Sequence, residues 1–89
     1  MIERELLVAN KLGLHARATA KLVQLLSGFR AGATLSAKGR EVNAKSIMGV
    51  MLLAAGQGTP VTVRVDGEDE EEAIAAVADL FARCFDEGG

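Results

Sequence analysis

The chain has 89 residues, of which 49% are apolar and 3% aromatic, and its formal net charge is −2. The scarcity of aromatic rings argues against a protein that stacks nucleic-acid bases, and no apolar run approaches the roughly 18 residues of a membrane span. We therefore expect one soluble, cytoplasmic domain over residues 1–89, with no membrane insertion and no nucleic-acid partner. The charge is unevenly divided: the first 65 residues carry 9 bases and 3 acids, and the remainder carries 1 base and 9 acids.

The first predicted elements are a strand over residues 2–9 and a helix over residues 16–27. Apolar side chains alternate with polar ones along the strand, which is typical of a half-buried β-strand. After the turn-like residues 10–13, apolar side chains recur at helical spacing. Gly28 then predicts a left-handed end of the helix.

A hairpin and a short helix are predicted next. Polar and apolar residues alternate over residues 33–44 around a central glycine, which favours a β-hairpin. Residues 46–54 are almost continuously apolar and begin with Ser46, a favourable N-cap, so we expect a short helix there. Gly56 and Gly58 are predicted to end it.

The last two predicted elements are a strand over residues 61–65 and a helix that carries an apolar stripe from Ile74 to Phe85. Five acids, residues 68–72, fall at the start of this helix, where the helix macrodipole favours negative charge. Cys84 belongs to the apolar stripe and is predicted to be a small core residue.

The order of the elements predicts an α+β fold: strand, helix, strand, strand, helix, strand, helix. Three of the four strands have one polar and one apolar face, so we expect a mostly antiparallel sheet that is covered on one face only. Three helices packed on that face would complete a two-layer domain.

The only histidine, His15, stands at the junction between a loop and the first helix. If Ala16 opens the helix, His15 is its N-cap, and the backbone N–H groups of Ala16, Arg17 and Ala18 form an anion site. The Arg17 guanidinium adds charge-assisted bonds to phosphate oxygens. These features suit a histidine that accepts a phosphoryl group and passes it on. A histidine that only caps the helix, beside a solvated arginine, stays open as the alternative.

We predict neither a metal nor a cofactor at this position. No second histidine and no cysteine stands near His15 in the sequence, so the usual ligands of a transition-metal site are missing.

The short second helix is too apolar to bury every side in so small a domain. If Val50 and Leu53 face the core, then Ile47, Met48 and Met51 are exposed and form an adaptable surface for a protein partner. The alternative is a deeper helix whose methionines fill gaps in the core.

Ser46 has two interpretations as well. As an N-cap it needs no further function. As a modification site it would place a phosphate where the helix start tolerates it and where it adds negative charge to the partner surface.

Two segments of the chain, GLHAR over residues 13–17 and NAKSIMG over residues 43–49, resemble the HPr family of the bacterial phosphoenolpyruvate-dependent sugar phosphotransferase system. The resemblance covers essentially the whole chain. It implies an open-faced β-sandwich of four antiparallel strands with three helices on one face, in the order βαββαβα. It also implies a monomeric carrier, not an enzyme.

By the same resemblance, His15 would be phosphorylated at its δ nitrogen with the assistance of Arg17. Enzyme I would donate the phosphoryl group, and a IIA-type domain or protein would accept it. Ser46 matches the position that HPr kinase/phosphorylase modifies in many bacteria. Ala18 departs from the usual proline of the family, and we expect a slightly looser turn there rather than a lost function.

An alternative within the same system is a nitrogen-related carrier, or a purely regulatory binding module that acts through Ser46 and the Ile47, Met48 and Met51 surface. The uneven charge suggests how partners dock, with the basic side facing them. The bases on that side, besides Arg17, include Lys21, Arg40 and Lys45. Charge reversal of Lys21 or Lys45 is expected to slow transfer more than reversal of Glu71 or Glu72.

Overall fold

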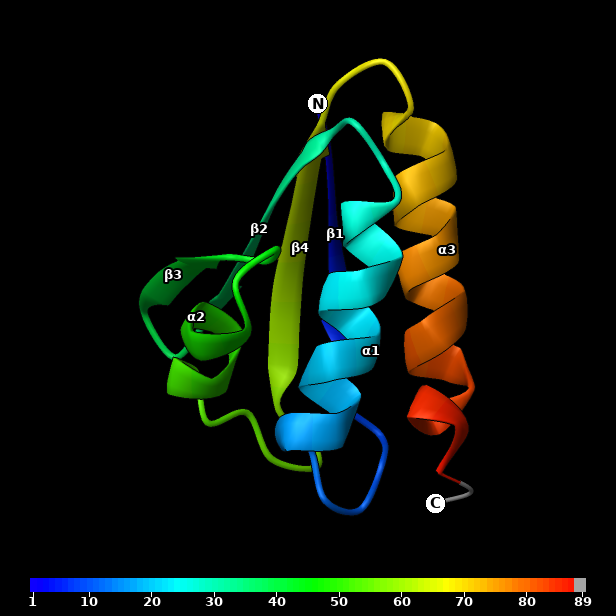
Figure 1. Ribbon diagram of the computed structural model, residues 1–89. Coiled ribbons are helices and arrows are strands. Elements are labelled where there is room, and N and C mark those ends of the chain that lie inside the picture. The colour runs from blue at the N-terminus through cyan, green and yellow to red at the C-terminus, as the bar shows by residue number, and fades with distance from the viewer. Residues whose placement is uncertain (88–89) are drawn as a thin grey trace.

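The computed structural model describes residues 1–87 as an antiparallel four-stranded sheet with three helices on one face (Figure 1). In chain order the elements are β1 (Ile2–Leu7), α1 (Ala16–Ser27), β2 (Gly32–Ala37), β3 (Arg40–Asn43), α2 (Ile47–Leu52), β4 (Pro60–Asp66) and α3 (Glu70–Ala82), with a short 3₁₀ turn at Cys84–Asp86. The strands lie in the order β1-β4-β2-β3, and each neighbouring pair is antiparallel. The predicted α+β, open-faced arrangement is confirmed.

The core lies between the sheet and the helices. In β4, one of the two central strands, Val61, Val63 and Val65 are fully buried, while Arg64 on the opposite face is exposed. This alternation is the period of two expected for a sheet with one covered face. Figure 1 shows α1 and α3 lying side by side across that face, with α2 beside α1 over the β2–β3 end.

Helix α1 begins and ends at the predicted residues, but its C-terminal geometry differs from the prediction. Gly28 has φ −79° and ψ −6°, which is a right-handed conformation. The helix closes with a tighter turn instead, in which the Gly28 and Phe29 N–H groups donate to Leu25 and Leu26. The prediction of a left-handed glycine was wrong because these shorter bonds already satisfy the terminal carbonyls.

Helix α2 ends at Leu52, earlier than Gly56 and Gly58 were predicted to end it. Ala54 adopts the left-handed conformation there, with φ +50°. Leu53 and Ala55 are both buried, so the chain turns into the core before it reaches a glycine.

Helix α3 ends at Ala82, and the predicted continuous stripe to Phe85 is broken. Cys84, Phe85 and Asp86 have φ of +53°, +54° and +62°, a run of left-handed residues that costs about 1–2 kcal/mol per residue. Phe85 offsets part of this cost because it is fully buried, with its ring centroid 4.9 Å from that of Phe81. Cys84 is only half-buried, so its predicted place in the core was wrong.

Within residues 1–87, the helices lack the combination of length and apolar character that crossing a bilayer would require.

Candidate functional site

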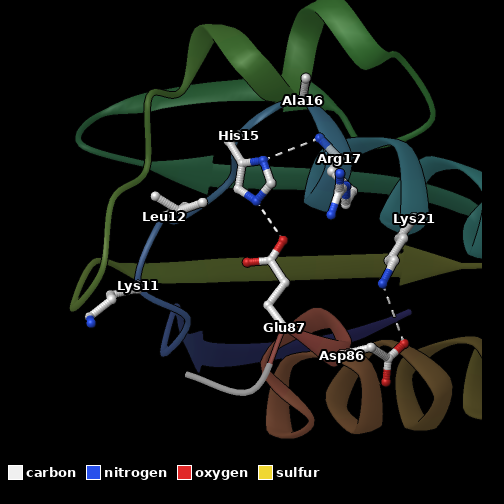
Figure 2. A pocket seen from close by; sticks show the side chains of 8 residues that line it. All are labelled: Lys11, Leu12, His15, Ala16, Arg17, Lys21, Asp86 and Glu87. Carbon is white, nitrogen blue, oxygen red and sulfur yellow. Dashed lines mark hydrogen bonds and ion pairs between the residues drawn. The ribbon is translucent and has the colours of Figure 1, made fainter.

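His15 is the N-cap of α1, as predicted. Its backbone is extended, and its Nδ1 accepts a hydrogen bond from the Arg17 backbone N–H at 3.3 Å (Figure 2). The first helical bond from this end runs from Thr19 N–H to the His15 carbonyl, 2.9 Å away. The amides ahead of Thr19 therefore belong to the open end of the helix, where they are donors to an anion.

Of the three backbone amides predicted to hold a phosphate, only two belong to exposed residues. Ala16 and Arg17 are exposed, whereas Ala18 has no accessible surface. That Ala18 contributes its amide to a phosphate stays a prediction, and in this structure the residue is fully buried.

The other nitrogen of the His15 ring contacts Glu87, from the end of the described chain. Nε2 lies 2.5 Å from Glu87 Oε2, and the two side chains face each other in Figure 2. Since Nδ1 accepts a hydrogen bond and a carboxylate has no proton to donate, the contacts place the ring proton on Nε2. The sequence around His15 offers only positive features, and this carboxylate adds the opposite charge.

Glu87 is itself held by Asn10, which is fully buried. Asn10 Nδ2 donates to Glu87 Oε1 at 2.9 Å and to the Gly13 carbonyl at 2.8 Å. The hydrogen bond from Asn10, and then the one from His15, hold the pKa of Glu87 below its usual value. The carboxylate is thus kept ionised where it meets the imidazole.

His15 lies in an open depression of about 810 Å³ that mixes basic, apolar and acidic side chains (Figure 2). The residues that line it are Lys11, Leu12, His15, Ala16, Arg17, Lys21, Asp86 and Glu87. Lys21 donates to the Phe85 carbonyl at 2.8 Å and lies 3.7 Å from the Asp86 carboxylate. Lysine and arginine side chains around an open helix end are suited to a phosphoryl group.

The loop that carries His15 is fixed against the loop after α2. Leu14 N–H donates to the Ala55 carbonyl at 2.9 Å, and Gly13 adopts φ +67°. A Cβ built on Gly13 would lie 2.5 Å from the same carbonyl oxygen and 2.7 Å from Gly56 Cα. The two loops therefore meet backbone to backbone, and only glycine fits at this position.

Ser46 is the N-cap of α2, as predicted, and its Oγ accepts a hydrogen bond from Gly49 N–H at 3.1 Å. Gly49 lies close to this hydroxyl, since a Cβ on Gly49 would be 3.3 Å from Ser46 Oγ. Ser46 is only partly buried.

The apolar surface on α2 is exposed as predicted. Val50 and Leu53 are buried, while Ile47, Met48 and Met51 are 46%, 77% and 44% exposed. Two further exposed leucines were not predicted. Leu52 is 60% exposed on the same helix, and Leu12 is 71% exposed in the depression beside His15.

Two of the basic residues assigned to the docking side contact backbone carbonyls elsewhere. Lys45 Nζ donates to the Phe29 carbonyl at 2.9 Å, just past the C-terminal end of α1 and thus at the opposite end of that helix from His15. Arg40 donates to the Leu52 carbonyl at 3.1 Å, at the end of α2. Among the described residues, no group of three or more His, Cys, Asp or Glu side chains is arranged to hold a metal ion.

Asn10 and Glu87 were absent from the sequence-predicted site. Glu87 lies 72 residues from His15, and the turn that brings it there contains no glycine from which a turn could be predicted. Asn10 stood only in a turn-like segment, where a polar residue is ordinary. Their positions in the sequence therefore gave no indication that either residue contacts the site.

Comparisons with known proteins agree on one family. The family described as "PTS HPr component phosphorylation site" matches residues 2–83. The chain is 68% identical to a phosphocarrier protein HPr of Xylella fastidiosa over 87 residues, which cover 98% of each chain. A crystal structure of HPr-C-His from Thermoanaerobacter tengcongensis has a TM-score of 0.94 at 45% identity, again covering 98% of each chain.

An HPr dimer is also known among the structural neighbours. A crystal structure of an HPr dimer from Thermoanaerobacter tengcongensis has a TM-score of 0.76 at 45% identity, covering 96% of this chain and 98% of that one.

Proposed function

The chain belongs to the HPr family of phosphocarrier proteins of the phosphotransferase system, and from this premise we propose that His15 carries the phosphoryl group on Nδ1. Members of this family are carriers rather than enzymes. The observation that carries the proposal is the orientation of the ring. Nδ1 faces the open N-terminal end of α1, while a carboxylate occupies the other nitrogen.

The transfer uses the Nδ1 lone pair as the nucleophile. It attacks phosphorus, the bond from phosphorus to the donor breaks, and the ring, which keeps its proton on Nε2, becomes cationic. The Glu87 carboxylate stabilises that cation. The Arg17 N–H loses Nδ1 as its acceptor at this moment and becomes a donor to a phosphate oxygen, together with Ala16 N–H and the Arg17 guanidinium. Transfer to the acceptor reverses these changes.

The donor in this proposal is enzyme I charged by phosphoenolpyruvate, and the acceptor is a IIA-type domain or protein, as the family implies. The exposed Leu12 beside His15 and the Ile47, Met48 and Met51 surface on α2 support docking of such partners close to the ring. We propose a cytoplasmic carrier, formed by residues 1–89 as a single HPr-like domain and acting as a monomer. A nitrogen-related pathway would use the same site with a different acceptor.

Ser46 supports a second, regulatory role. Its Oγ caps α2 beside the exposed Ile47 and Met48, so a phosphate there would suit the helix start and add charge to the partner surface. This modification would come from an HPr kinase/phosphorylase and would act on binding rather than on the fold.

The proposal is tested by incubating the protein with enzyme I and labelled phosphoenolpyruvate and mapping the modified residue. We expect an acid-labile adduct on His15 and no label in His15→Ala, because the chain has no other histidine. Label that persists in His15→Ala would refute the role of His15. A parallel incubation with ATP and HPr kinase/phosphorylase should label wild type but not Ser46→Ala, which separates the two sites.

A further inference from the structure

We propose that Glu87 and Asn10 are positioning residues that hold the His15 ring in the tautomer that transfer needs. The inference rests on the proposed function, in which Nδ1 is the nucleophile. It assigns to Glu87 the task of keeping the proton on Nε2, and to Asn10 the task of holding Glu87 there as an ionised acceptor.

The chain of contacts has only one consistent set of proton positions. Both Asn10 bonds use Nδ2, which donates one hydrogen to the Gly13 carbonyl and the other to Glu87 Oε1. Glu87 then presents Oε2 to the imidazole. A carboxylate accepts only, so Nε2 must donate, and Nδ1 stays unprotonated with its lone pair directed to the Arg17 N–H.

The burial of Asn10 supports a dedicated role. Asn10 has no accessible surface, and its Oδ1 has no hydrogen-bond partner within residues 1–87. An asparagine with a buried, unsatisfied oxygen is unfavourable for stability, yet both of its donors are used. The position thus serves as a source of two hydrogen bonds, one to the His15 loop and one to Glu87.

The path of the chain to Glu87 also supports it. After α3 the backbone passes through three successive left-handed residues, none of them glycine, before it reaches Glu87. Strained backbone of this kind persists only where its surroundings over-determine it. Here the Phe85 ring is buried in the core, and its carbonyl accepts a hydrogen bond from Lys21 on α1. The strained turn delivers a carboxylate to His15.

The hydrogen bond between His15 and Glu87 is partly shielded from water. The Glu87 side chain is 14% exposed and the His15 side chain 28%, so water competes only in part for their hydrogen bond. Besides Glu87, the charged groups that line the depression with His15 are Lys11, Arg17, Lys21 and Asp86. Among the described residues, Glu87 alone has a charged side-chain atom within hydrogen-bond distance of the ring.

Glu87→Gln tests the role of the carboxylate with little change of shape. The introduced amide has one accepting and one donating end, and Asn10 offers it only donors. The amide oxygen must therefore face Asn10 and the NH₂ group must face Nε2, which then has to accept. At a pH where the ring is neutral, imidazole ¹⁵N spectra should show the proton on Nε2 in wild type and moved to Nδ1 in Glu87→Gln.

The rate of phosphorylation by enzyme I should fall roughly tenfold in Glu87→Gln, which is the low end of the loss seen when the carboxylate that orients a metal-binding histidine is removed. Glu72→Gln is the matched control, because it removes an exposed carboxylate from the first turn of α3. It should leave both the tautomer and the rate unchanged. An unchanged tautomer in Glu87→Gln, or a wild-type proton on Nδ1, would overturn the proposal.

A double variant tests Asn10. In Asn10→Ala with Glu87→Gln, the introduced amide is free to turn its oxygen toward the ring, so the proton should return to Nε2. If thermal unfolding shows that the variant with Asn10→Ala does not fold, Asn10→Ser is used in its place. A proton that stays on Nδ1 would remove Asn10 from the proposal. If the wild-type protein accepts no phosphate on His15, the proposed function fails. The tautomer measurements still test whether Glu87 and Asn10 hold the proton on Nε2.

Discussion

At the scale of single residues, the site depends on a backbone contact as much as on side chains. Gly13 lets the loop before His15 lie against the Ala55–Gly56 backbone, at a distance where no Cβ fits. Leu14 then donates to the Ala55 carbonyl and fixes the loop in register with the end of α2. The direction of the His15 ring is therefore set partly by a residue with no side chain.

Gly13→Ala should destabilise the protein by about 3 kcal/mol or more, because a left-handed alanine adds to a clash with backbone that cannot move cheaply. Gly39→Ala is the matched control. Gly39 also has a positive φ, +77°, but nothing lies within 4 Å of its Cβ position. Gly39→Ala should lower the free energy of unfolding only by the cost of a left-handed alanine, about 1–2 kcal/mol. Urea unfolding measures both, and equal losses would mean that the loop contact contributes nothing.

Residues at the site differ in how well the sequence predicts them. His15 and Ser46 were predicted as N-caps because capping is a local property, decided by a residue and the turn that follows it. Glu87 and Asn10 were missed because their roles arise from contacts between distant segments. No local pattern records that a turn at residues 84–86 will bring a carboxylate to a histidine 72 residues away.

At the scale of elements, helix starts were predicted well and helix ends poorly. Helix α1 ends at the predicted Gly28 but without the left-handed conformation, α2 ends before its predicted glycines, and the predicted helix to Phe85 is interrupted after Ala82. Near each of them, a basic side chain from another part of the chain donates to a backbone carbonyl: Lys45 to Phe29, Arg40 to Leu52, and Lys21 to Phe85. These long-range bonds lie at or just beyond the helix ends, and they fix the path of the chain there through contacts that no local pattern predicts.

The start of α3 is linked to the turn after α1 by Asp69. Although Asp69 occupies the N-cap position, its carboxylate does not cap the helix. It accepts instead from the Arg30 and Ala31 N–H groups, both at 2.8 Å. These bonds, the one from Arg30 first, hold the pKa of Asp69 below its usual value.

Asp69→Asn should destabilise the fold, because the two N–H groups bond to different carboxylate oxygens and the amide turns its NH₂ group toward one of them. The sign of the pH dependence follows from the lowered pKa. The ionised Asp69 contributes its full stability above the unfolded-state value of about 4, and the contribution is lost as the pH falls from there through the lower folded-state value. The difference in free energy of unfolding between wild type and Asp69→Asn should be constant near neutral pH and shrink in acid. A difference that grows in acid would contradict this assignment.

At the scale of the whole molecule, the bases that the sequence assigned to the docking side lie in separate places. Lys45 and Arg40 are held by helix-end carbonyls, and Lys45 also acts on Asp69 at the far end of α1. Since α1 has 12 residues, at 1.5 Å each it separates that end from His15 by roughly 18 Å. The basic side chains that line the depression around His15 are Lys11, Arg17 and Lys21.

Because these bases lie in separate places, their effects on transfer and on stability should also separate. Lys11→Gln should slow phosphorylation by enzyme I roughly two- to fivefold without loss of stability, since an exposed charge near the contact mainly affects encounter. Added salt should shrink that difference. Lys45→Gln should lower the free energy of unfolding by about 1 kcal/mol, because a half-buried hydrogen bond is lost, while the rate per folded molecule stays the same. A slower transfer in Lys45→Gln with unchanged stability would restore the broad basic face as the docking surface.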